Sequence, residues 1–121
     1  MERKYLTTKD ATSEKLLEEL KLKNDIPSQR IKRLLAFPDL TRKKNSPLKF
    51  IIDKILAMEM FRDFDVIEIP EIVSVRDNFD LLNSPADHPS RKETDTYYVS
   101  KDYILRTQTT VMWPFYLQKE E

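Results

Sequence analysis

The chain has 121 residues and contains no glycine. Glycine occupies left-handed backbone conformations without steric cost, so its absence restricts tight turns. Turns must be made by proline, asparagine, aspartate and serine, and we expect the loops to be longer and less tight. Glycine-rich loops that hold phosphate groups are also excluded, because their backbone must approach the phosphate closely.

Composition limits the class of protein further. Apolar residues make up 40% of the chain, enough for the core of one domain or of a piece of one. No apolar run approaches the roughly 20 residues of a membrane span, and no signal peptide opens the chain. Cysteine is absent, which excludes disulfides, cysteine-bound zinc and a thiol nucleophile. We therefore expect a cytoplasmic protein with no membrane partner.

Charge is distributed unevenly along the chain. Residues 1–45 hold 12 Lys and Arg against 7 Asp and Glu, whereas residues 46–121 hold 9 against 14. We place a boundary after the basic linker at 39–45, which separates a basic helical arm (1–45) from an acidic body (46–121). Such an arm can bind nucleic acid, or it can be a solvated helical face, and composition leaves both interpretations open.

Two short helices are predicted in the arm, after a polar and frayed start at residues 1–11. The first is capped by Thr12 and runs over residues 13–23, with leucines on one face. The second begins at Ser28 and ends before Pro38. Its basic residues cannot all lie on the apolar face, so they face solvent or a phosphate backbone: Arg30, Lys32 and Arg33.

The body begins with a strong helix signal. Ser46 offers a capping hydroxyl, and Pro47 suits the first helical position. Apolar residues then follow the helical spacing, so a helix is predicted to about Met60. Lys49 and Asp53 are spaced as an ion pair on its polar side. Phe64–Ile69 predicts a strand buried on most of both faces, which Pro70 ends.

The rest of the body combines a long loop with a hairpin. Residues 74–94 are predicted to form an irregular loop, and a loop of this length in a compact domain is usually functional. A hairpin is expected from Thr96–Val99 and Tyr103–Arg106, with residues 100–102 at its tip. A final helix is capped by Thr109 or Thr110. The sequence thus predicts an α+β fold, with N-terminal helices followed by a sheet.

Several linked blocks carry a family resemblance: Phe79-Asp80-Leu81-Leu82-Asn83, Asp87-His88-Pro89-Ser90-Arg91, Asp95-Thr96-Tyr97-Tyr98 and Leu105-Arg106-Thr107-Gln108-Thr109-Thr110. In order and spacing they resemble the catalytic domain of class II phenylalanyl-tRNA synthetase, alpha subunit, over residues 46–113. The resemblance implies a partial class II antiparallel sheet. It also implies that the long helix and strand at 47–70 are similar to motif 1, which builds the subunit interface in that family.

The resemblance implies a function as well. The family activates phenylalanine with ATP and Mg²⁺ and transfers it to tRNA. The implied partners are phenylalanine, tRNA, and a synthetase beta subunit or a second copy bound through residues 47–70. Because motifs 2 and 3 of the family lie later in the chain, we expect an amino-terminal fragment that is inactive alone. The alternative is a noncatalytic tRNA-binding or dimerising module derived from a synthetase.

Candidate site residues fall in the last third of the chain. In the family, a His and a Ser contact the substrate amino acid, and Gln108 and Thr110 stand at those positions. Thr110 keeps the hydroxyl, whereas Gln108 can hydrogen-bond but cannot take up a charge. Arg106 is a candidate anion binder, because a guanidinium offers a fork to carboxylate or phosphate. Its alternative role is a salt bridge with Asp95 or Asp80.

An active-site loop is predicted around Asp87, His88 and Arg91. His88 could act as a general base or metal ligand, or it could be a loop histidine that hydrogen-bonds its neighbours. Arg91, like Arg106, could bind an anion or stabilise the fold. We predict no metal site and no catalytic nucleophile, because adenylate chemistry needs positioning and charge stabilisation.

Overall fold

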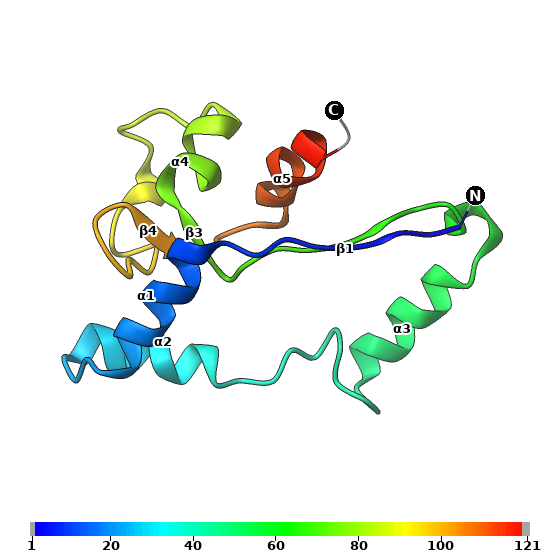
Figure 1. The fold of residues 1–121 in the computed structure, drawn as a ribbon, viewed down its shortest axis with the longest axis horizontal. Coiled ribbons are helices and arrows are strands. Elements are labelled where there is room, and N and C mark those ends of the chain that lie inside the picture. Colours follow the sequence, from blue (N-terminus) through cyan, green and yellow to red (C-terminus); the bar gives the residue numbers. More distant parts are fainter. Residues whose placement is uncertain (1, 120–121) are drawn as a thin grey trace.

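The computed structural model describes residues 2–119, which form helices joined to two small sheets (Figure 1). The helices are α1 (Ala11–Lys21), α2 (Ile26–Leu35), α3 (Pro47–Leu56), α4 (Val75–Asn78) and α5 (Met112–Lys119). The strands are β1 (Tyr5–Thr7), β2 (Val66–Glu68), β3 (Ile72–Ser74) and β4 (Tyr103–Leu105). Single 3-10 turns lie at Glu59–Phe61, Asp80–Leu82, Pro89–Arg91 and Thr109–Val111. The predicted mixture of helices and strands is therefore confirmed.

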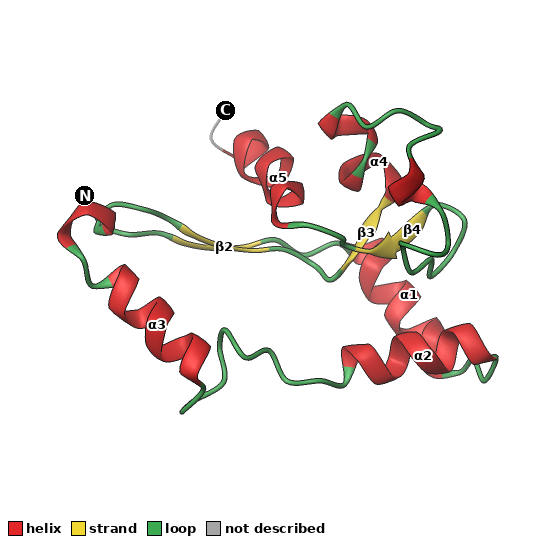
Figure 2. Cartoon of the chain, turned by 180° about the vertical axis from the view of Figure 1, so that it is seen from behind, coloured by secondary structure: helices red, strands yellow, loops and turns green. Residues whose placement is uncertain are grey.

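The first sheet pairs the start of the chain with its middle. β1 and β2 run parallel, with Tyr5 opposite Val66, and form a long ribbon (Figure 2). The Arg3 side chain holds this end: it donates to the carbonyls of Phe64, Leu56 and Phe61 over 2.6–2.9 Å. The prediction that the first eleven residues are frayed is wrong for residues 2–11. The sequence of a short polar segment gives no signal of hydrogen bonds to residues more than 50 positions away.

The second sheet joins β3 to β4 in antiparallel register, with Val73 opposite Ile104. The expected hairpin survives as one isolated bridge between Tyr98 and Ile104. The main partner of β4 is thus β3 and not residues 96–99. The core lies against this sheet and consists of Ile69, Val73, Phe79, Ile104 and Val111, each at most 4% exposed.

The arm helices start at aspartates and not at the predicted hydroxyl residues. Asp10 caps α1 by accepting from the N–H groups of Thr12 and Ser13. Asp25 caps α2 by accepting from the Ser28 N–H, and Pro27 lies in its first turn. An aspartate before the helix serves as well as a hydroxyl, since either oxygen can accept from a free N–H.

Contacts also link the arm to the body. The buried Ser13 hydroxyl donates to the Ile72 carbonyl over 2.6 Å, and β1 pairs with β2. The boundary at residue 45 stays a prediction, and these contacts cross it. Within the described chain, no helix has both the length and the apolar character needed to span a bilayer.

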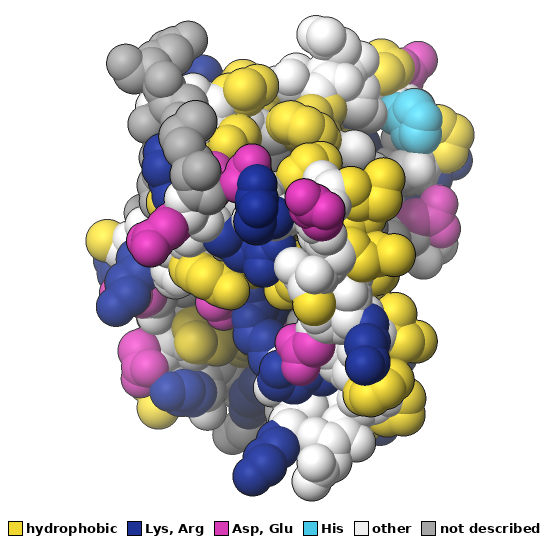
Figure 3. Space-filling model, turned by 90° about the vertical axis from the view of Figure 1, so that its right-hand side faces the viewer, with side chains coloured by type: hydrophobic (Ala, Val, Ile, Leu, Met, Phe, Trp, Pro, Cys, Tyr) yellow, Lys and Arg dark blue, Asp and Glu magenta, His cyan; other side chains and the backbone are white. Residues whose placement is uncertain are grey.

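α3 begins at the predicted Pro47 but ends at Leu56, where the prediction continued to about Met60. Ser46 precedes it, but the Ser46 hydroxyl donates to the Leu40 carbonyl and does not cap the helix. The predicted Lys49–Asp53 ion pair is confirmed at 2.8 Å. None of the ten residues of α3 is buried. On this side of the molecule, hydrophobic side chains lie exposed among charged ones (Figure 3).

The predicted loop at 74–94 contains short helical turns connected by irregular backbone. The left-handed conformations that glycine would favour are taken by Asn45 (φ 68°) and Asn83 (φ 60°). Asparagine tolerates this region better than most residues with a side chain. The expectation that asparagine helps to replace glycine is therefore met at these two positions.

Candidate functional site

Residues 107–110 connect β4 to α5 and are held at both ends. At one end, the Asn78 side chain accepts from the Thr107 N–H over 3.1 Å and donates to the Thr107 hydroxyl over 2.9 Å. At the other end, Val111 is fully buried in the core. Three residues between these points are exposed: Gln108, Thr109 and Thr110. A segment of this kind presents polar side chains from a fixed backbone.

Gln108 and His88 line the same hollow, which has a volume of about 320 Å³. The Gln108 amide donates to the Asn78 carbonyl over 3.4 Å, which adds a second link to the end of α4. The remaining walls combine apolar and small polar side chains: Phe79, Leu82, Asn83, Ser84, Pro85 and Ser90. The hollow therefore combines hydrogen-bonding side chains with apolar walls.

His88 starts the 3-10 turn Pro89–Arg91. Its Nδ1 accepts a hydrogen bond from the Ser90 N–H over 3.1 Å. This contact agrees with the interpretation of His88 as a loop histidine bonded to its neighbours. Asp87, beside it, is exposed. Nδ1 accepts this bond, so proton donation from the neutral ring would have to come from Nε2.

Arg91 lies beneath the loop, with only 14% of its side chain exposed. Its guanidinium pairs with Asp80 at 2.7 Å, donates to the Ser84 carbonyl, and stacks 4.9 Å from the centre of the Phe79 ring. The Arg91 carbonyl in turn accepts from the Tyr98 hydroxyl. Arg91 thus holds the two ends of the loop together.

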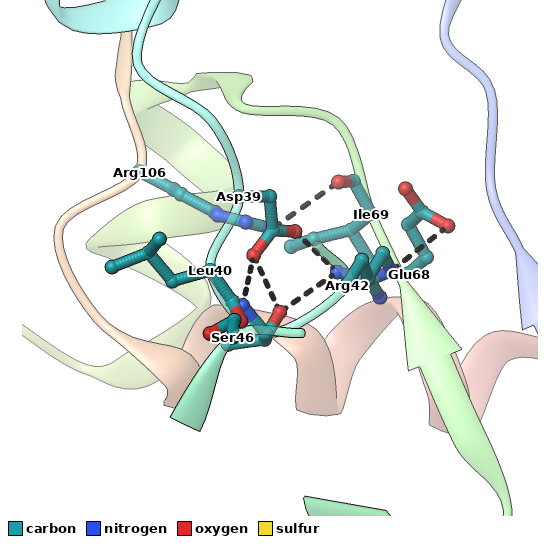
Figure 4. Close-up of polar contacts among 8 residues, drawn as sticks. Asp39, Leu40, Arg42, Ser46, Glu68, Ile69 and Arg106 are labelled. Carbon is teal, nitrogen blue, oxygen red and sulfur yellow. Dashed lines mark hydrogen bonds and ion pairs between the residues drawn. The ribbon is translucent and has the colours of Figure 1, made fainter. Parts of the chain in front are cut away.

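Arg106 lies on a different and larger hollow, of about 960 Å³, between the arm, α3 and the β1–β2 ribbon. Its Nη1 donates to the Ile69 carbonyl over 3.2 Å (Figure 4). Asp39 lines the same hollow and pairs with Arg42 at 2.7 Å. Neither Asp80 nor Asp95 pairs with Arg106 among the described residues, so the alternative role of Arg106 as their salt-bridge partner is not observed. Asp80 pairs with Arg91.

The candidate residues therefore divide among four places. Gln108 and His88 share one hollow, Arg106 lines another, and Arg91 is largely buried under the loop. Thr110 is exposed on the 3-10 turn before α5. Their assignment to substrate binding stays a prediction, with Gln108 as the residue that faces a hollow from a fixed segment.

Sequence reasoning missed Asn78 as a functional candidate. Its side chain is fully buried, and both of its polar ends are used to hold Thr107. An asparagine inside a predicted loop carries no signal of burial in a single sequence. The one available hint is its place directly before Phe79, which starts the first block.

Asp39, which lines the larger hollow with Arg106, and Asp65, which directly precedes β2, each have a lowered pKa. The Thr41 hydroxyl, followed by Arg42, lowers the pKa of Asp39. The Tyr116 hydroxyl, followed by the Lys4 N–H, lowers the pKa of Asp65. Hydrogen bonds to the ionised form account for both directions. Both groups thus carry negative charge at neutral pH.

Divalent metal binding needs several oxygen or nitrogen ligands gathered at one point. Among residues 2–119, no three or more His, Asp or Glu side chains gather in this way. The described residues therefore do not form a metal site of this kind.

Comparison with known proteins defines the class. Residues 33–121 match the family described as "tRNA synthetases class II core domain (F)". The match covers most of the chain and includes the elements from α3 to α5. The chain belongs to this family.

The individual proteins that the chain resembles narrow the comparison to one kind of synthetase subunit. The chain is 37% identical over 106 residues to the phenylalanine–tRNA ligase alpha subunit of Clostridium novyi, covering 87% of this chain and 30% of that protein. It is 36% identical over 96 residues to the alpha subunit of Desulfitobacterium hafniense, covering 79% and 26%. It is 41% identical over 71 residues to that of Moorella thermoacetica, covering 59% and 21%. The resemblance is confirmed, and the chain spans less than a third of the length of these relatives.

Proposed function

We propose that this chain supplies part of the amino-acid-binding region of a phenylalanine–tRNA ligase alpha subunit. The observation that carries the proposal is the exposed segment 108–110, held between Asn78 and Val111 beside the hollow that Gln108 and His88 line. The family match and the similarity to alpha subunits support the same reaction class. Gln108 and Thr110 are the residues that we assign to phenylalanine.

In this proposal the segment binds and orients; it does not make bonds. Amino-acid activation requires the substrate carboxylate to meet the α-phosphate of ATP in line, so a fixed position of the amino acid lowers the barrier. Thr110 offers a hydroxyl and Gln108 an amide, and neither takes up a charge in the process. The long hydrogen bond of 3.4 Å from the Gln108 amide to the Asn78 carbonyl favours one orientation of the amide.

ATP and Mg²⁺ belong to the complete ligase reaction. Stabilising the transferring phosphoryl group needs cations near its oxygens. Arg91 is already engaged with Asp80, and Arg106 donates to the Ile69 carbonyl. These two arginines are thus occupied by contacts within the fold, and we propose that the 121-residue chain alone does not activate phenylalanine.

α3 is the proposed partner surface. Four of its large apolar side chains are 42–63% exposed: Leu48, Phe50, Ile51 and Ile55. Exposed apolar area of this kind commonly marks a protein interface. We propose that residues 47–70 form a motif-1-like surface that binds the synthetase beta subunit or a second copy. This surface also keeps the alternative function open, a noncatalytic dimerising or tRNA-binding module.

The basic arm is the proposed tRNA contact. Arg30 and Arg33 of α2 are exposed, whereas the Lys32 ammonium donates to the Lys23 carbonyl near the end of α1. Phosphate contacts would therefore come mainly from the two arginines.

The cytoplasmic location of the protein also stays a prediction.

Amino-acid-dependent ATP–pyrophosphate exchange tests the proposal. The complete protein, with a partner subunit if it needs one, should exchange with phenylalanine far better than with tyrosine or leucine. The 121-residue chain alone should show no exchange. Exchange by the complete protein with another amino acid would overturn the substrate, and no exchange at all would favour the noncatalytic module.

A further inference from the structure

We infer that Asn78 is a positioning residue, which fixes the segment 107–110 so that Gln108 and Thr110 face their ligand. The inference rests on the proposed function for the identity of that ligand. The claim that Asn78 fixes the segment rests on hydrogen bonds alone. Every hydrogen bond that the Asn78 side chain makes goes to Thr107, and its carbonyl accepts from Gln108.

The orientation of the Asn78 amide is set by its partners. A backbone N–H can only donate, so the atom that faces the Thr107 N–H, at 3.1 Å, must be the amide oxygen. The amide nitrogen then faces the Thr107 hydroxyl at 2.9 Å. Two bonds from one planar group to one residue fix both the distance and the direction of Thr107. They act as a peptide group does in a strand pair.

Asn78 itself is held firmly. Its side chain is fully buried, and it is the last residue of α4. The next residue, Phe79, is 2% exposed and belongs to the core with Val111. One packed cluster therefore holds both ends of the exposed segment. The fixed backbone between them is the kind of support that a binding site needs to keep its side chains in place.

Loss of the Asn78 side chain should displace the 107–110 segment in addition to lowering the stability of the fold. Thr107 is itself exposed, so water can replace the amide as its hydrogen-bond partner. Water does not hold the segment in one place, however. A displacement of the binding groups by about 1 Å can reduce catalysis by about a hundredfold. The expected result is weaker phenylalanine use with little change in ATP use.

Asn78→Ala in the complete ligase is the first test. The KM for phenylalanine in ATP–pyrophosphate exchange should rise by about tenfold or more, while the KM for ATP stays within about twofold. Asn78→Asp keeps the oxygen that accepts from the Thr107 N–H, and should recover part of the loss. Thr107→Val removes only the hydroxyl contact and should have a smaller effect than Asn78→Ala.

Ser13→Ala is the matched structural control. It removes a hydrogen bond from a buried side chain, as Asn78→Ala does, but this bond goes to Ile72 of β3 and not to the 107–110 segment. It should lower the melting temperature without changing the ratio of the two KM values. If Asn78→Ala behaves like Ser13→Ala, with lower stability and an unchanged ratio, the positioning role is overturned.

Amide hydrogen exchange separates this inference from the proposed function. In Asn78→Ala, the Thr107 N–H should exchange at least about tenfold faster, whereas the Val75 N–H, bonded to the Asp102 carbonyl, should not change. Unchanged protection of Thr107 would overturn the inference even if the enzyme were active. The wild-type protein could lack phenylalanine-dependent ATP–pyrophosphate exchange while Asn78→Ala still shows the faster hydrogen exchange at the Thr107 N–H. This result would overturn the proposed function and support the positioning role of Asn78.

Discussion

At the residue scale, polar side chains that bond to backbone groups hold the 79–98 loop together. Arg91 bonds to the Ser84 carbonyl and to Asp80, and the Tyr98 hydroxyl bonds back to Arg91. The Thr96 hydroxyl donates to the Ser90 carbonyl in the same way. The loop contains no glycine and makes its short turns with other residues, such as the 3-10 turns Asp80–Leu82 and Pro89–Arg91. The side-chain bonds add a constraint between these turns.

Arg91→Lys should destabilise the protein by about 1–3 kcal/mol, because an ammonium cannot keep the ion pair, the carbonyl bond and the ring contact together. Chemical denaturation measures the change. The exposed neighbour provides the control: Lys92→Ala should stay within about 0.5 kcal/mol. Equal stability of the two variants would show that the Arg91 contacts contribute nothing to folding.

Tyr116→Phe should raise the pKa of Asp65 toward its ordinary value of 3.8, because the largest cause of the lowered pKa is removed. The native pKa lies below the unfolded one, so the contribution of Asp65 to stability is present above pH 3.8 and is lost as the pH falls through the native value. Wild type should therefore be more stable than the variant at neutral pH, and the difference should shrink in acid. Carboxyl NMR titration and denaturation at several pH values check this, with Tyr97→Phe as control. An unchanged pKa of Asp65 would contradict the assigned cause.

At the element scale, α3 and α2 present their side chains to solvent in different ways. α3 has an apolar surface, and α2 has a basic one that carries Arg30 and Arg33. An apolar helix without buried residues is unusual for a monomer, because folding gains most from removing such area from water. The two helices therefore suggest two different kinds of partner.

The isolated chain should self-associate through α3, because no residue of that helix is buried. Sedimentation velocity at increasing concentration should show dimers or larger species, and Ile51→Asp should shift them toward monomer. Leu22→Asp is the control, since Leu22 is 84% exposed but lies outside α3. A clean monomer at high concentration would count against the interface.

Binding of tRNA by the arm should weaken steeply with salt, because each neutralised phosphate releases counterions. Filter binding at several salt concentrations measures the slope. Arg30→Ala with Arg33→Ala should flatten the slope by about two, since two phosphate contacts are lost. Lys54→Ala, a basic change on α3, serves as control. Salt-independent binding, or an unchanged slope in the double variant, would remove the arm from the tRNA contact.

Helix positions could be predicted where local signals suffice. Pro47 marks the start of α3, and the Lys49–Asp53 spacing gives the observed pair. The strands are three residues each, too short for an alternating pattern, and β1 pairs with a segment about 60 residues away. The same limit applies to the candidate site. The 107–110 segment could be identified from its motif, whereas its support by Asn78 depends on a contact between residues 29 positions apart in the sequence.

At the scale of the whole molecule, the two sheets connect regions that the charge pattern would separate. The β1–β2 ribbon and the Ser13–Ile72 bond attach the basic arm to the acidic body. The core around Ile104 then positions both hollows on one framework. Because the chain spans less than a third of its relatives' length, the proposed activity is to be measured on the complete protein.

The most direct measurement is the effect of Thr110→Val on phenylalanine-dependent ATP–pyrophosphate exchange by the complete protein. Valine has nearly the same size as threonine but lacks the hydroxyl, and removing a hydrogen bond to substrate costs about 0.5–1.5 kcal/mol. The account predicts a KM for phenylalanine that rises by about two- to tenfold, with an unchanged KM for ATP. Thr94→Val, at an exposed position of the 79–98 loop, should match wild type. An unchanged KM for phenylalanine in Thr110→Val, in an enzyme that does exchange with phenylalanine, would contradict the assignment of this segment to the substrate.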